Sequence, residues 1–439
     1  MSVWTACWQG LGLVVGALLA VFSWLWITRP RTNAPGPTPL PLLGNLPHFW
    51  RNLPVVVNDF RKLQRQYGDV FRFYIGPKLI LIATQPDDAK RLLVGCKMRE
   101  RDDYTTRALI PFSGYGLIVN KGELWKTHRK LIEPTFHAEV LHGYTEAFNK
   151  GAQFLCSQLA EANGNEVDIS KMLLHTSFHF LTLSMYGVSF DELEPDRKKQ
   201  AVAVDVFISG LELIQKRFYQ PWLQIDWIIS LTPDGEALKR QLNLYNGMAK
   251  QGLAIMRERR SKALPKKRKT FMDVMMDDHG NLLLPENEVY DEESLRLFPA
   301  VPVAPVFASE DIPLSGGRYV APRGSVVFVF LNLLHRQPAI YPDPDKFDPG
   351  RFLEGGGSSA LPPYSYLPFG AGSRLCVGAR FAMLVMKTVL ATVMRQFRII
   401  PGSTREELEE IAVFVTGKPV HGINIRCVPR TAPVTVDCT

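Results

Sequence analysis

The stretch FGAGSRLCVGAR, residues 369–380, places one cysteine inside a glycine-rich segment. A buried cysteine usually packs as a small hydrophobic side chain, but glycines at this spacing also let a backbone approach a flat or bulky group closely. Residues 378–397 follow with the spacing of an amphipathic helix. Cys376 therefore precedes a predicted helix start, where the helix dipole and free N–H groups stabilise a thiolate.

Two other interpretations of this cysteine are weaker. A glycine-rich phosphate loop needs a strand–GxGxxG–helix context or a GK[ST] ending, and the stretch has neither. The six cysteines are scattered, and the sequence has no CxxC pair or Cys/His pair that is typical of a zinc site. Sparse, unpaired cysteines fit a reducing compartment.

The decapeptide 369–378 resembles the haem-binding signature of the cytochrome P450 family, which has phenylalanine, glycine, a basic residue, cysteine and glycine at fixed offsets. The resemblance implies that Cys376 is the thiolate ligand of haem b iron, a ligand that favours O–O cleavage. It also implies that the other signature residues shield the sulfur, let the loop lie under the porphyrin and reach a propionate. These residues are Phe369, Gly370, Gly372, Arg374 and Gly378.

A second segment, GELWKTHRKLIEPTFH at 122–137, resembles the C helix of the same family. Trp125 and Arg129 are four residues apart and share one helix face. Taken alone, such a pair is ordinary packing, but in the family this face holds the haem propionates. Lys126 and Lys130 on the same helix indicate a basic surface for a redox partner, and the resemblance implies electrons from NADPH through a reductase.

Two further segments resemble the family's buried polar triad. ESLRLFP at 293–299 matches the ExxR helix and supplies Glu293 and Arg296, and PDKFDPGRF at 344–352 supplies Arg351. Gly350 stands where the family usually has glutamate. The expected role is structural, because a buried charge cluster must be fully paired to be tolerated.

The segments at 114–137 and 294–302 look most like family 4, whose members often hydroxylate fatty acids and related lipids. The resemblance implies a lipophilic substrate that faces residues 109–117, 301–305 and 413–417. The side chains there do not specify one ligand.

The N-terminus predicts a membrane anchor. Residues 2–27 carry no charge and are long enough to cross a bilayer as a helix. Arg29 and Arg31 follow, so the positive-inside rule leaves the rest of the chain in the cytosol. A cleaved signal peptide would need a basic start and a shorter apolar core, and a buried soluble helix is the other alternative. We expect a single-pass protein of the endoplasmic reticulum membrane.

A proline-rich hinge at 28–48 is expected to be stiff and extended, and residues 49–439 are expected to form one haem-thiolate domain. The chain is 46% hydrophobic and 21% charged, as in globular proteins. Its net charge of +8 is concentrated in residues 257–269, which fit a solvated loop or a contact with an anionic membrane face. A nucleic-acid partner would conflict with the anchor, and none is expected.

The local patterns predict a mainly α protein with a smaller β region, and the resemblance implies the cytochrome P450 fold. Residues 55–67 have helical spacing, and 69–84 read as a hairpin that turns at Gly76. Residues 86–276 are predicted to be mostly helical. GSVVFVFLNLL at 324–334 reads as a strand.

One expected family feature is missing from the sequence. NEVYDE at 287–292 runs straight into ESLR, whereas the family has there its long I helix with an Ala/Gly–Gly–x–Asp/Glu–Thr motif. This motif occurs nowhere in the chain, so no catalytic acid or threonine is assigned. An omitted exon and an incomplete gene model would both give such a join near Glu292–Glu293. Two functions follow as hypotheses: a monooxygenase, or a non-catalytic variant that binds haem weakly or only binds a partner.

Overall fold

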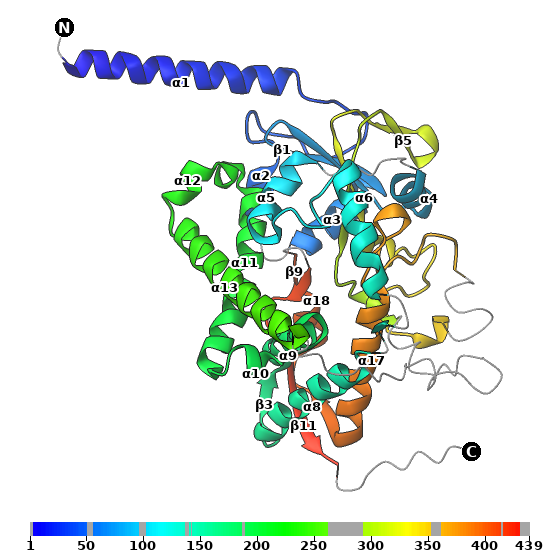
Figure 1. Cartoon of the computed structure of the whole chain (residues 1–439). Helices are drawn as coiled ribbons and strands as arrows, with labels where there is room; N and C mark the ends of the chain where they lie inside the picture. Colours follow the sequence, from blue (N-terminus) through cyan, green and yellow to red (C-terminus); the bar gives the residue numbers. More distant parts are fainter. Residues whose placement is uncertain are drawn as a thin grey trace.

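The structure is a computed structural model that describes residues 3–50, 56–95, 102–136, 140–141, 143–186, 189–261, 293–352, 361–413 and 416–430. The fold is mostly helical with a smaller strand part, which confirms the predicted fold class (Figure 1). The helices are α1 Val3–Ile27, α2 Leu46–Trp50, α3 Val56–Tyr67, α4 Pro86–Lys90, α5 Asp103–Ser113, α6 Gly122–Ile132, α8 Thr145–Glu161, α9 Ile169–Tyr186, α10 Phe190–Leu193, α11 Arg197–Tyr219, α12 Asp226–Ser230, α13 Pro233–Ser261, α16 Leu331–Leu334, α17 Ala379–Gln396 and α18 Arg405–Glu409.

Short helical turns connect several of these elements, and the strands form four small sheets. The turns are η2 Arg91–Gly95, η3 Glu133–Phe136, η4 Pro221–Gln224, η5 Ser315–Gly317, η6 Pro349–Phe352 and η8 Gly372–Arg374. The strands are β1 Val70–Ile75, β2 Lys78–Ala83, β3 Glu166–Asp168, β4 Val303–Phe307, β5 Ile312–Leu314, β6 Tyr319–Ala321, β7 Val326–Phe330, β8 Phe397–Pro401, β9 Ile411–Val413, β10 Gly417–Pro419 and β11 Asn424–Pro429.

The largest sheet has the strand order β1-β2-β7-β4. β1 and β2 form the predicted hairpin, with Val70 opposite Ala83 and Gly76 at a positive φ of 56° in the turn. β7 pairs parallel to β2 and antiparallel to β4. A three-stranded sheet, β3-β11-β8, and two two-stranded sheets complete the β region.

The prediction of a strand at 324–334 is partly wrong. β7 ends at Phe330, and the next four residues form the buried helical turn α16. Both pieces are fully buried and, apart from Asn332, apolar, and an apolar run without alternation cannot distinguish a buried strand from a buried helix. Among the described residues from 86 to 261, the expectation of mostly helical structure is met, apart from the short strand β3. Residues 96–101, 137–139, 142, 187–188 and 262–276 lie outside the described residues.

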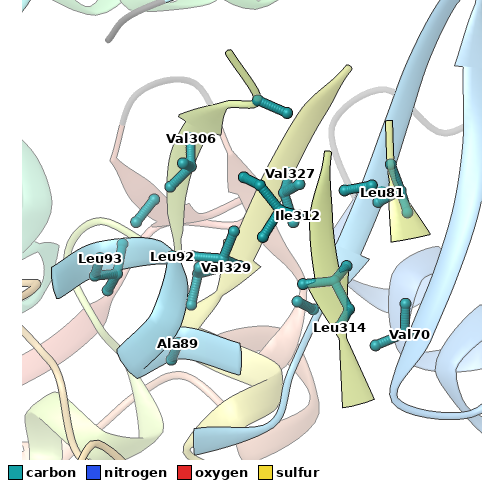
Figure 2. Close-up of a cluster of buried hydrophobic side chains, with 14 of the residues drawn as sticks. Val70, Leu81, Ala89, Leu92, Leu93, Val306, Ile312, Leu314, Val327 and Val329 are labelled. Atoms are coloured by element: carbon teal, nitrogen blue, oxygen red, sulfur yellow. The ribbon is translucent and has the colours of Figure 1, made fainter. Parts of the chain in front are cut away.

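The largest core cluster lies between the main sheet and the segment α4–η2. Figure 2 shows Ala89, Leu92 and Leu93 of that segment beside the valines of β4 and β7. Leu92 is completely buried and Leu93 is almost so. This packing fixes the position of η2, which contacts the cysteine segment described below.

Helix α1 projects away from the rest of the molecule (Figure 1). Its residues 8–27 form a helix long and apolar enough to cross a membrane, and none of the side chains described there is buried. The chain after it is attached to the main sheet, since the Tyr74 hydroxyl donates to the Pro30 carbonyl (3.1 Å) and the Arg72 amide donates to the Pro35 carbonyl (2.8 Å). The predicted hinge therefore runs along β1.

Helix α17 begins directly after the cysteine segment and packs on α8. The Phe381 ring meets the Phe148 ring edge-on, with centroids 5.1 Å apart. Although α17 is apolar over much of its surface, Val393 is its one buried residue. Most of this helix is thus left half-exposed by its described neighbours.

Candidate functional site

The cysteine segment forms a closed loop that ends at the start of α17. The Cys376 amide donates to the Phe369 carbonyl (3.1 Å), and the Leu375 amide donates to the Gly372 carbonyl (3.0 Å). Gly378 is the N-cap of α17, so the sulfur lies three residues before the first helical residue. The Cys376 side chain is exposed. The loop therefore presents a thiol on an open surface at a helix N-terminus.

The three glycines of the loop lie in different surroundings, so the physical reason for a glycine differs between the three positions. Gly372 has φ +69°, and a Cβ there would lie 2.0 Å from the Leu93 carbonyl oxygen, so the backbone of η2 excludes any side chain. Gly370 has φ +77° but open space around it. A Cβ at Gly378 would make ordinary contact with Phe136 at 3.6 Å. The sequence interpretation related these glycines to a bound group, whereas at Gly372 the contact is with η2.

The structure brings the loop together with helix α6. The Arg374 guanidinium lies over the Trp125 ring, 4.0 Å from its centroid, and its Nη2 donates to the Asn120 carbonyl (3.0 Å). Arg129 Nη1 donates to the Leu375 carbonyl (2.9 Å), next to the cysteine. Two guanidinium groups and one indole thus surround the segment that carries the thiol.

Trp125 and Arg129 of α6 also line a basic groove on the surface. A depression of about 410 Å³ is lined by Trp125, Lys126, Arg129 and Lys130, together with Glu133 and Pro134. Lys126 and Lys130 are exposed, and Lys126 Nζ is 2.5 Å from Glu123 Oε1. This groove adjoins the side of α6 that contacts the cysteine loop.

The three residues expected to form a triad lie together in the structure. Arg296 donates from Nε and Nη2 to the two oxygens of Glu293, at 2.6 and 2.7 Å, and both side chains are completely buried. Arg351 Nε lies 3.7 Å from Glu293 Oε1. The Asp348 amide also donates to that oxygen (2.9 Å). The buried carboxylate is therefore fully satisfied.

His335, which the sequence interpretation missed, connects this cluster to the cysteine segment. Its carbonyl accepts from Arg296 Nη1 (2.9 Å), and its Nε2 accepts from the Leu367 amide (2.8 Å), two residues before Phe369. Burial lowers the pKa of His335 to about 3, so the ring stays neutral and can accept. Nothing in LNLLHR distinguishes this histidine from an ordinary core residue.

Comparison with known proteins identifies the family. The family profile described as Cytochrome P450 matches residues 34–291 and 288–423. The chain belongs to the cytochrome P450 family. Cytochrome P450 4d2 of Drosophila melanogaster is 27% identical over 89% of this chain and 93% of its own length. Cytochrome P450 4F2 of Homo sapiens is 27% identical over 78% of this chain and 80% of its own length. These relatives confirm the resemblance to family 4.

The residues present fit the cofactor of a cytochrome P450, which is haem. Cys376 offers one soft sulfur donor on an exposed surface, as haem iron requires in this family. Arg374, Arg129 and Trp125 adjoin that donor, and guanidinium groups are suited to bind carboxylates such as the haem propionates.

Proposed function

We propose that Cys376 would be the thiolate ligand of haem iron and that Arg374, Arg129 and Trp125 would hold the haem propionates. The haem, when bound, supplies the activation of O2 from which one atom enters a lipophilic substrate. This proposal is carried by one observation, the convergence of the exposed thiol with two guanidinium groups and an indole. Phe369, Gly370, Gly372 and Gly378 shape the loop around the sulfur.

Glu293, Arg296 and Arg351 act as a structural cluster in this proposal. They hold the chain before the cysteine loop through His335, whose ring accepts from the Leu367 amide. A rigid support of this kind fixes the direction of the sulfur, as functional sites require. No role in the reaction itself is assigned to these three residues.

The substrate is proposed to be a fatty acid or a related lipid, and the electrons to come from NADPH through a reductase. The basic groove on α6, with Lys126 and Lys130 exposed, supports a docking surface for an acidic partner protein. The resemblance to family 4 supports the substrate class.

We place the protein in the endoplasmic reticulum membrane, with α1 spanning it and the haem domain in the cytosol. Leu40 and Trp227 are exposed apolar side chains, and their segments lie on the side of the body from which α1 projects (Figure 1). Deleting residues 1–32 is expected to release the protein from integral membrane fractions. Glycosylation of a site engineered near residue 140 would contradict this orientation.

A second candidate function, a non-catalytic variant, is favoured by the length of the alignments. The alignment with cytochrome P450 4d2 extends over 476 residues, whereas 89% of this chain is about 391 residues, so about 85 positions have no residue here. The two segments matched to the family also meet and overlap at residues 288–291. Both facts support an omitted block near Glu292–Glu293, a join that lies mostly outside the described residues.

The two candidates differ in turnover. The full chain would be reconstituted with haem, a reductase, NADPH and dodecanoate, and hydroxylated product would be measured against NADPH consumed. A monooxygenase forms hydroxylated product in proportion to the NADPH that is consumed. The non-catalytic variant gives the haem-thiolate spectrum without product, because the acid and threonine that organise proton delivery are missing.

A further inference from the structure

A polar cavity of about 490 Å³ lies at one end of the main sheet. Its walls come from the start of β2, the end of β4, the first turn of α5, the residue before α6 and the turn η4, and none of its lining residues belongs to the cysteine loop. In Figure 1, α5 and β1 lie on the side of the molecule from which α1 projects. The function proposed above makes no use of this cavity.

The charges around the cavity do not cancel. Lys78 Nζ lies 2.6 Å from Asp102 Oδ1, and Lys121 forms an ion pair with Asp103. Arg107 also lines the cavity and is exposed, and it forms no ion pair within the part of the chain that the structure describes. The lining therefore carries one net positive charge.

A second cation lies directly behind this wall. Arg217 of α11 is 2% exposed, its Nη2 donates to the Arg107 carbonyl (3.0 Å), and its own carbonyl accepts from Gln224 Nε2 (3.0 Å). Both Arg107 and Gln224 line the cavity. Arg217 Nε and Nη1 are buried and have no hydrogen-bond partner among the described residues.

The described surroundings of Arg217 compensate its charge only weakly. The carboxylate that acts on its pKa is Asp226, which is exposed and makes no ion pair with it within 4.0 Å among the described residues. Burying an unpaired guanidinium is unfavourable, and removing its partner from a buried ion pair is strongly destabilising. The field of a buried charge is also screened less than that of a surface charge. An anion that enters the cavity would be attracted by the positive charges of both Arg107 and Arg217.

The neighbouring side chains favour an anion that carries an alkyl chain. The Tyr104 ring lines the cavity and packs edge-on against Phe218 (5.5 Å between centroids), which in turn packs on Phe328 of β7 (5.9 Å). Phe307 is another lining residue. An apolar aromatic surface therefore begins where the charged wall ends.

We propose that this cavity binds the anionic end of an alkyl carboxylate, with Arg107 at the wall and Arg217 behind it. The proposal deepens the proposed function, on which it rests for the lipophilic nature of the substrate. It assigns the discrimination between a charged and an uncharged amphiphile to two named residues. It assigns no step of the reaction to them.

The test compares octanoate with 1-octanol by isothermal titration calorimetry on the full chain in detergent micelles. We expect octanoate to bind at least about tenfold more tightly than 1-octanol, as for charge-assisted hydrogen bonds. Each of the substitutions Arg107→Gln and Arg217→Gln is expected to reduce this difference in Kd to about twofold or less. Lys216→Gln is the matched control, because Lys216 precedes Arg217 on α11 but is exposed and pairs with Asp234. Equal binding of the two compounds by the unchanged chain, or a preference that survives both arginine substitutions, would overturn the proposal.

A second readout separates a binding role from a structural one. Without ligand, Arg217→Gln is expected to leave the melting temperature unchanged or to raise it, because it removes a buried unpaired charge. A fall of several degrees would make Arg217 a structural support and contradict the proposal. Binding is measured without turnover, so octanoate preference without product would refute only the monooxygenase function.

Discussion

Arg296 and Arg217 show two outcomes for a buried guanidinium. Arg296 is completely buried and donates to both Glu293 oxygens and to the carbonyls of His335, Pro344 and Lys346. Within the part of the chain that the structure describes, Arg217 donates to one acceptor, the Arg107 carbonyl. The ExxR spacing predicts the Glu293–Arg296 pair, but it cannot predict the ring of carbonyls, which comes from a segment about forty to fifty residues later.

Arg296→Ala is expected to destabilise the protein by about 3–5 kcal/mol, because it leaves the Glu293 carboxylate buried without its bidentate partner. Urea unfolding of the full chain in detergent measures this change. The control is Lys346→Ala, since the Lys346 side chain is exposed and only its carbonyl contacts Arg296. A loss below about 1 kcal/mol for Arg296→Ala would be in the range of an exposed ion pair. It would show that the cluster does not stabilise the folded state.

The buried His179 is expected to lower the free energy of unfolding in mild acid. Burial lowers its pKa to about 4 from 6.5, although Asp191 lies 4.0 Å from its Nε2. Above pH 6.5 the ring is neutral in both states. As the pH falls from 6.5 to 4, the unfolded chain binds the proton first, so up to about 3 kcal/mol of stability is lost.

His179→Phe preserves the ring that packs on Phe154 and is expected to flatten the pH dependence of urea unfolding in this window. His421→Gln, at an exposed histidine, is the control. An unchanged slope between pH 6.5 and 4 in His179→Phe would contradict the assignment. His335, whose pKa burial lowers to about 3, contributes its own loss from pH 6.5 down to about pH 3, so part of the slope is expected to remain in His179→Phe.

At the scale of elements, local sequence patterns predict the helices and hairpins that interactions between nearby residues determine. The hairpin β1–β2 follows from Gly76 and its flanking apolar strands, and α17 follows from its helical spacing. The end of β7 is missed because burial continues through α16. The pairing of β3 with β11 joins segments more than two hundred and fifty residues apart, and no local pattern contains it.

The contact between η8 and η2 is another feature that the sequence does not reveal, and Gly372 tests it. Gly372→Ala must place a Cβ where the Leu93 carbonyl lies, at a positive φ, so we expect loss of the folded loop and of haem binding. Gly370→Ala is the matched control, since it has a similar φ but open space and should cost only about 1–2 kcal/mol. Haem content and urea unfolding measure both variants, and equal effects would show that the backbone contact is unimportant.

At the scale of the whole molecule, the omission proposed near Glu292–Glu293 would leave the cysteine side of the haem site in place. The cysteine loop, α6 and the Glu293–Arg296 cluster all lie in segments that match the family. Helix α17 keeps a half-exposed apolar surface in the described structure. A distal helix would supply both the cover and the proton relay of a complete site.

Inserting the I-helix block of a family 4 relative between Glu292 and Glu293 is therefore expected to raise dodecanoate hydroxylation from near zero. Product per NADPH, measured with a reductase, compares the two chains. A scrambled block of equal length controls for the insertion itself. Turnover by the original chain at the rate of an intact relative would mean that another segment supplies the distal acid.

The most direct test of this account is the reduced carbon monoxide spectrum of the full chain beside that of Cys376→Ala. A thiolate ligand on haem iron gives a strongly red-shifted Soret band. The account predicts this band for the chain that binds haem and its complete loss in Cys376→Ala, with Cys156→Ala, at a buried cysteine outside the loop, retaining it. A red-shifted band that survives in Cys376→Ala would show that another residue binds the iron.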